Sequence, residues 1–216
     1  MPLLLIDLDN TLIDRAGAFG RWAAEFVAAR GGDDGDTQWL VAADEDGFRS
    51  RERLAAMIGE RFGLGGDTAA ELLAELRAGL VRQIVPDAAV TGAVRAARDA
   101  GWVPFVITNG TVRQQESKLR HTGLDREVAG WVISEGAGLR KPDPRIFWLA
   151  STEAGQSLDG AWMIGDSAEL DIVGARNVGL PSVWLHRGRQ WPHTEFQPDH
   201  MAGSFPDAVA AVLAAG

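Results

Sequence analysis

The stretch Leu3–Leu12, LLLIDLDNTL, decides the fold of this chain. Its apolar residues 3–6 run directly into Asp7, and a second carboxylate, Asp9, follows two positions later. A short apolar run that ends in polar residues is typical of a strand buried on both faces of a parallel sheet. Because open α/β sheets bind their ligands at the carboxyl ends of the strands, Asp7 is predicted to lie at such a site. The alternative is a surface turn, where Asp and Asn are also common.

The composition is that of an acidic globular protein. The 216 residues carry a formal net charge of -9 and include no cysteine. An acidic chain has no general attraction for nucleic acid or for an anionic membrane, so neither is expected as a partner. Without cysteine, disulfides and thiolate nucleophiles are excluded. The first apolar run is too short for a signal peptide, and no apolar stretch approaches transmembrane length, which favours a cytoplasmic protein.

Residues 14–85 show helical periodicity and no convincing strand pattern. Apolar residues recur there at the spacing of amphipathic helices, and glycine-rich runs separate the segments. We therefore expect an all-helical insert. Its predicted parts are a helix over 19–27, a loop over 31–36, a helix over 48–62 and a helix that begins at Asp67 or Thr68.

From Pro86 onward, helical and strand patterns alternate. This alternation implies right-handed crossovers and a mainly parallel sheet, so residues 1–13 and 86–216 are predicted to form one α/β core. Strands are predicted over 102–107, 132–134, 162–164 and 182–185, and residues 187–198 are expected to be irregular. Residue types that cap helices predict helix starts at Asp87, Thr111 (in a capping box with Gln114), Asp143, Ser167 and Ser204.

Side chains suited to catalysis stand where three of the predicted strands end. Asp7 and Asp9 follow the first strand, Thr108 the second, and Asp166 the strand over 162–164, while Lys141 opens the helix before that strand. The carboxyl ends of parallel strands share one edge of a sheet, so these distant residues are predicted to converge. The result would be a cluster of carboxylates with one ammonium and one hydroxyl group.

Four short motifs stand in order along the chain: Asp7-Leu8-Asp9-Asn10-Thr11, Thr108-Asn109-Gly110, Lys141-Pro142-Asp143 and Gly165-Asp166-Ser167-Ala168-Glu169-Leu170-Asp171. In residue type, order and spacing they resemble the motifs of the haloacid dehalogenase-like hydrolase superfamily, and the resemblance covers nearly the whole chain. It implies a Rossmann-like, three-layer α/β core with the strand order 5-4-1-2-3. It also implies that residues 14–85 are a helical cap of the C1 type.

The resemblance implies a phosphatase that uses Mg²⁺. Asp7 would be the nucleophile that forms an aspartyl-phosphate, and Asp9, expected to lie among anions, would protonate the leaving alcohol and then activate water. Mg²⁺ would be held by the carboxylates of Asp7 and Asp166 and by the backbone carbonyl of Asp9. Asp171 is expected to hold the metal's water molecules; the alternative is an ordinary carboxylate in the first turn of a helix.

Lys141 is one of only two lysines, against 19 arginines. Such selective use suggests that a compact point charge is required, which would neutralise phosphoryl oxygens and hold the nucleophile. The hydroxyl group of Thr108, with the N–H groups of Asn109 and Gly110, would bind a phosphoryl oxygen. The other lysine, Lys118, lies in the middle of a predicted helix and is expected to be a solvated surface group.

The resemblance leaves several reactions open. Dehalogenases of the family lack a carboxylate two residues after the nucleophile, so Asp9 argues against dehalogenation. Phosphonate-cleaving and mutase relatives use a lysine or histidine of the cap, and residues 14–85 contain neither. A non-catalytic binding protein is a further alternative. We expect a small phosphorylated metabolite as substrate and a monomer or homodimer; Arg49, Arg51 and Arg53 either bind an anionic part of the substrate or form a solvated helix face.

Overall fold

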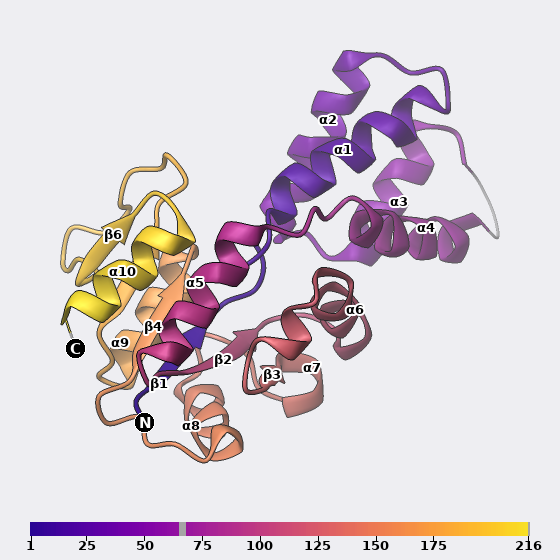
Figure 1. Ribbon diagram of the computed structural model, residues 1–216. Helices are drawn as coiled ribbons and strands as arrows, with labels where there is room; N and C mark the ends of the chain where they lie inside the picture. Colours follow the sequence, from indigo (N-terminus) through magenta and orange to yellow (C-terminus); the bar gives the residue numbers. More distant parts are fainter. Residues whose placement is uncertain (65–67, 216) are drawn as a thin grey trace. The chain divides into compact units, whose positions relative to one another are not determined.

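The computed structural model describes residues 1–64 and 68–215 (Figure 1). The chain forms two compact units: Met1–Ile13 with Pro86–Gly216, here called the core unit, and Asp14–Val85, here called the helical unit. Asp67, one of the two predicted starts of a helix, lies outside the described residues.

A six-stranded sheet forms the centre of the core unit, and all neighbouring strands in it are parallel. Its strands are β1 (Leu3–Ile6), β2 (Val103–Thr108), β3 (Trp131–Ile133), β4 (Trp162–Gly165), β5 (Ser182–Leu185) and β6 (His200–Ala202). Their order is β3-β2-β1-β4-β5-β6. The predicted order 5-4-1-2-3 is confirmed, and β6 extends it at one edge. The sequence did not predict β6, because this short strand has a single buried residue and no apolar run.

Helices cover the sheet and begin largely where the predicted caps stand. The helices of the core unit are α5 (Ala88–Asp99), α6 (Val112–Thr122), η2 (Leu124–Arg126), α7 (Ser134–Ala137), α8 (Pro144–Ala154), η3 (Ala168–Ile172), α9 (Val173–Asn177) and α10 (Phe205–Ala215). The side chains of Asp87, Asp143 and Ser167 accept hydrogen bonds from the first turns that follow them. The capping box of Thr111 with Gln114 is wrong: Thr111 makes no side-chain cap, and the Glu135 carboxylate accepts from the N–H of Val112 at 2.8 Å.

The core has three layers, since helices cover both faces of the sheet. The central strand β1 is therefore buried on both faces. All four residues of β1 are inaccessible to solvent, as the unbroken apolar run predicts. Leu3 and Leu5 belong to a cluster with Phe147 of α8, and α8 packs against α9. Leu4 and Ile6 point to the opposite face because side chains alternate along a strand. On that side, α5 and α10 pack against each other and lie side by side in Figure 1.

The helical unit contains α1 (Arg15–Ala28), α2 (Asp34–Asp44), η1 (Glu45–Gly47), α3 (Arg51–Arg61) and α4 (Thr68–Arg82). Its described residues include no strand. The predicted loop over 31–36 is partly wrong because α2 already begins at Asp34. Asp33 and Asp36 form a capping box there, so acidic residues that resemble a loop in sequence are the start of a helix. The helix predicted over 48–62 begins later, at Arg51, with Ser50 as its cap.

Aromatic rings and a buried ion pair hold the helical unit together. Trp22 packs between Phe19 and Phe26, with ring centroids 5.4 and 5.0 Å apart. The buried guanidinium of Arg15 binds the Asp44 carboxylate in a bidentate manner. Arg51 also binds Asp44, at 2.6 Å, and Arg49 binds Glu45, so two of the three clustered arginines are used within the unit. In the described ranges, no helix is both long and apolar enough to cross a membrane.

Candidate active site

The carboxyl ends of β1 and β4 bring Asp7 and Asp166 together. The N–H of Asp7 donates to the carbonyl of Ile164 at 3.0 Å, so the β1–β4 ladder continues to the residue that was predicted to be reactive. Asp166 follows β4 directly, and both carboxylates are buried. The predicted convergence of these strand ends follows from the parallel order of the sheet.

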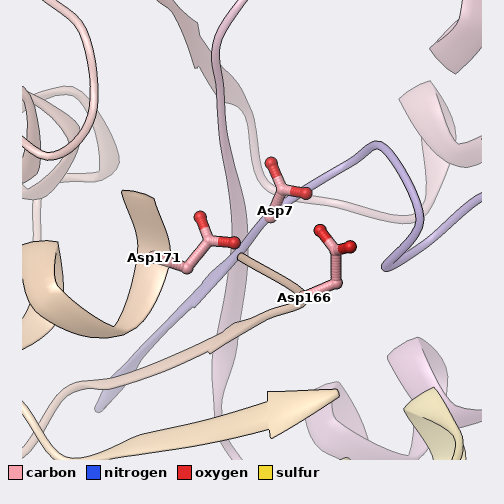
Figure 2. A group of neighbouring side chains, drawn as sticks. All are labelled: Asp7, Asp166 and Asp171. Carbon is pink, nitrogen blue, oxygen red and sulfur yellow. The ribbon is translucent and has the colours of Figure 1, made fainter. Parts of the chain in front are cut away.

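A third carboxylate, that of Asp171, completes the cluster (Figure 2). The three side chains point toward one another, and each offers an oxygen within 4.8 Å of the others. Asp171 reaches the site from η3, which passes close to Gly165. A Cβ atom on Gly165 would lie 2.3 Å from the carboxyl carbon of Asp171, so only glycine leaves room for this carboxylate.

Lys141 is the cation at the centre of the cluster. Its Nζ atom, in a residue only 1% exposed, donates to Asp7 Oδ1 at 2.6 Å and to Asp171 Oδ1 at 2.7 Å. Asn109 fixes the backbone of Lys141: its Oδ1 accepts from the Lys141 N–H at 2.9 Å and its Nδ2 donates to the Lys141 carbonyl at 3.1 Å. The sequence predicted only that the backbone N–H of Asn109 binds a phosphoryl oxygen; the hold of its side chain on Lys141 was not predicted.

Burial and like charge raise the pKa values of the clustered carboxylates. Burial raises the pKa of Asp7, and the Asp171 charge adds to this, against the opposing effect of Lys141. Burial and the charge of Asp7 raise the pKa of Asp166 to about 6, although Arg187 opposes the shift. Burial lowers the pKa of Lys141, but the carboxylates of Asp171 and Asp7 more than offset it, so the net shift is upward. Lys141 bridges Asp7 and Asp171, and Arg187 and Arg189 pair with Asp166, so all three carboxylates have a cationic partner.

The donor set fits a hard divalent cation. Mg²⁺ prefers oxygen ligands and is usually held by one or two carboxylates, and Asp7 and Asp166 offer two at the same place. Both oxygens of Asp171 are already bonded, Oδ1 to Lys141 and Oδ2 to the N–H of Ser167 at 2.9 Å. Asp171 is therefore less available as a direct ligand than Asp7 or Asp166 would be. Arg187 donates to Asp166 Oδ2 at 2.9 Å, a contact that no motif indicated.

Asp9 forms an ion pair with Lys118. Lys118 Nζ lies 2.6 and 2.7 Å from the two carboxylate oxygens of Asp9, and Gln115 Nε2 donates to Asp9 Oδ2 at 3.0 Å. The prediction that Lys118 is a solvated surface group is wrong, because the residue is only 3% exposed. Asp9 therefore lies beside an ammonium group, and not only among anions as expected. The rarity of lysine was a signal for Lys118 as much as for Lys141.

The second motif surrounds the same network. Thr108 is buried, and its Oγ1 accepts from Gln115 Nε2 at 2.7 Å. The N–H of Gly110, a predicted phosphate ligand, instead donates to Ser134 Oγ at 2.9 Å. Gly110 has a φ of +148°, and a Cβ there would lie 2.9 Å from the amide carbon of Gln115. In this structure Gly110 thus makes room for Gln115.

Three curated relatives cover two kinds of reaction. The chain is 35% identical to a phosphoserine phosphatase of Thermus thermophilus over 53% of this chain and 46% of that protein, so it spans about half the length of that relative. It is 28% identical to a phosphoglycolate phosphatase of Agrobacterium fabrum over 98% of this chain and 92% of that protein. It is also 28% identical to an (S)-2-haloacid dehalogenase of Burkholderia cepacia over 52% of this chain and 48% of that protein.

The fold has close counterparts among solved structures. The HAD-hydrolase YfnB of Bacillus subtilis, solved with bound magnesium, superimposes with a TM-score of 0.77 at 22% identity over 98% of both chains. A family model described as haloacid dehalogenase-like hydrolase matches residues 1–179. That range contains β1 to β4 and every carboxylate and lysine of the site described above. The chain therefore belongs to the haloacid dehalogenase-like hydrolase family.

Proposed function

We propose that this protein is a Mg²⁺-dependent phosphatase that hydrolyses a small phosphomonoester through an aspartyl-phosphate on Asp7. The observation that carries the proposal is the pair of carboxylates at the end of β1, each bonded to its own buried lysine: Asp7 to Lys141 and Asp9 to Lys118. Two carboxylates in different surroundings can take different roles. The phosphatases among the relatives support the reaction class.

In the first step, Asp7 attacks phosphorus and the bond from phosphorus to the ester oxygen breaks. Asp9 enters this step protonated, gives its proton to the leaving alkoxide as the general acid, and becomes the carboxylate that Lys118 binds. Lys141 neutralises charge on the phosphoryl oxygens and holds the attacking carboxylate. The hydroxyl group of Thr108 donates to a phosphoryl oxygen.

In the second step, Asp9 takes a proton from water and the resulting hydroxide attacks the phosphorus of the aspartyl-phosphate. The acyl-phosphate bond breaks, inorganic phosphate leaves, and Asp7 is restored as a carboxylate. Asp7, Asp166 and the backbone carbonyl of Asp9 would hold Mg²⁺, with Asp171 behind them. When bound, the ion supplies positive charge that lets an anionic carboxylate approach an anionic ester.

Metal dependence is the test of this proposal. With 4-nitrophenyl phosphate, turnover is expected in Mg²⁺ and none in excess chelator. Asp166→Ala is expected to raise the Mg²⁺ concentration for half-maximal rate at least tenfold, about 1.4 kcal/mol, because it removes one of two anionic ligands. Mg²⁺ should also raise the melting temperature of the wild type more than that of Asp166→Ala. Asp159→Ala, at an exposed carboxylate before β4, is the matched control.

Three outcomes would overturn the proposal. Full turnover in chelator would exclude a metal role. Release of halide from 2-haloacids without release of phosphate would make the protein a dehalogenase, as one relative is. No turnover of any member of a phosphorylated metabolite panel, with intact metal binding, would favour a binding protein.

We also propose that the helical unit is the cap of this enzyme and sets its substrate. Support comes from its composition of helices over the described residues and from its insertion between β1 and α5. Lids that exclude water from a reaction move on ligand binding. Hydrogen exchange of amides around residues 14 and 85 is therefore expected to slow when orthovanadate and Mg²⁺ are added, with α10 as internal reference. Unchanged exchange throughout the helical unit would contradict a lid.

A further inference from the structure

Both lysines of this chain are buried against a carboxylate of the first motif. Lys118 is 3% exposed and Lys141 is 1% exposed, although lysine is normally among the most exposed residues. Among the described residues, the ion pairs on the surface use arginine, for example Arg120 with Glu116 and Arg77 with Glu52, apart from the contact of His193 with Glu169. Arginine thus serves the surface and one buried pair, Arg15 with Asp44, whereas both lysines stand at buried positions. Lys141 is accounted for by the mechanism above, whereas Lys118 is not.

The surroundings of Lys118 suit an ammonium group. Three acceptor oxygens lie 2.6 to 2.7 Å from its Nζ atom: both carboxylate oxygens of Asp9 and Oε1 of Gln115. An ammonium group has three N–H donors that rotate together, whereas a guanidinium is a planar fork. Arginine would not meet these three acceptors from the same backbone position. This explains why lysine stands here in a chain that otherwise prefers arginine.

Gln115 joins this pair to the second motif. It lies one turn before Lys118 on α6, is buried, and donates through Nε2 to Asp9 Oδ2 at 3.0 Å and to Thr108 Oγ1 at 2.7 Å. Since Thr108 Oγ1 accepts this bond, its own proton must point elsewhere. The carbonyl of Asn109, at 3.5 Å, is a distant acceptor for it. Gln115 therefore presents the Thr108 hydroxyl as a donor for a ligand.

Stability alone gives no reason to bury Lys118. Taking an ammonium and a carboxylate out of water is costly, and replacing a buried ion pair by apolar residues is often neutral or stabilising. Asp9 is the more exposed partner, with 27% of its side chain accessible against 4% for Lys118. The buried ammonium group thus binds a carboxylate that is partly exposed to solvent, as expected where a lysine orients a residue that acts on a substrate.

We propose that Lys118 and Gln115 are positioning residues, which hold the Asp9 carboxylate and the Thr108 hydroxyl in one fixed arrangement for the phosphoryl group. The proposal rests on the proposed function, because it assigns these residues to the step in which Asp9 transfers a proton. Misplacement of a catalytic group by about 1 Å can cost about 100-fold in rate. Substitution of Lys118 should therefore lower kcat more than it raises KM. Substitution of Gln115 should change both kcat and KM.

A double-mutant cycle separates positioning from a structural role. Lys118→Met is expected to lower kcat for phenyl phosphate about 100-fold in the wild-type background. In an Asp9→Asn background it should lower kcat by less than about threefold, because Lys118 acts through Asp9. Lys118→Arg is expected to recover less than a tenth of the wild-type kcat, since it restores the charge without the geometry.

Gln115→Leu should raise KM as well as lower kcat. Arg120→Met, an exposed cation on the same helix, is the control.

The outcomes distinguish failure of this inference from failure of the proposed function. Equal losses in the wild-type and Asp9→Asn backgrounds, or a kcat for Lys118→Met within threefold of that for Arg120→Met, would overturn positioning while leaving the phosphatase intact. A wild type that shows no turnover and no phosphorylation of Asp7 would overturn both. If Lys118→Met fails to fold, Lys118→Arg in the two backgrounds carries the same test.

Discussion

Asp7→Asn is expected to lower phosphatase turnover by at least about 10⁴-fold and to prevent phosphorylation of the protein. An amide oxygen is a poor nucleophile and cannot form the acyl-phosphate. The fold should be retained, because asparagine has the same shape and Lys141 keeps its contact with Asp171. The measurement is kcat with 4-nitrophenyl phosphate at saturating Mg²⁺, together with the mass of acid-quenched protein.

A matched variant makes this result specific. Asp159→Asn makes the same chemical change at an exposed carboxylate and should leave kcat within about twofold, as for most surface substitutions. Near-normal turnover by purified Asp7→Asn would show that no covalent bond forms at Asp7.

Asp9→Asn is expected to slow alkyl phosphates far more than aryl phosphates in the first step. An alkoxide is a strong base and needs a proton as it leaves, and general acid catalysis is typically worth about 10² to 10⁴-fold. An aryl oxide is a weaker base and needs less help. Asparagine retains the size of the side chain but cannot supply the proton.

The second step should suffer with both kinds of ester, because asparagine cannot activate water. With an aryl phosphate, Asp9→Asn is expected to give a burst of the phenol followed by slow hydrolysis, and rapid-quench mass spectrometry should trap phosphorylated Asp7. Equal slowing of alkyl and aryl esters, with no burst and no trapped species, would exclude Asp9 as the proton-transfer residue.

The sequence predicted the sheet and the residues at its strand ends for a physical reason. Continuous apolar runs identify strands buried on both faces, and parallel order then brings Asp7, Thr108 and Asp166 to one edge regardless of their separation in sequence. Lys141 was predicted from its place before the helix that leads into β4, and the rarity of lysine in this chain supported that choice. These signals depend only on the chain itself and on the handedness of its crossovers.

What the sequence did not predict depends on how helices and loops pack. Lys118 lies on a mostly polar helix, α6, whose periodicity does not show which polar residue is turned inward. Arg187 reaches Asp166 from a segment without regular structure, where no pattern gives the path of the chain. Asp33 and Asp36 were interpreted as a loop because capping residues and loop residues are the same types.

Having two side-chain amines, each against a different carboxylate, also makes this chain convenient for spectroscopy. Isotope labelling of lysine alone would give two side-chain signals, one from Lys141 beside Asp7 and one from Lys118 beside Asp9. Each signal would report on one carboxylate through the whole reaction, without any engineered probe. The same burial implies that amine-directed reagents for surface coupling would find few targets on the folded protein.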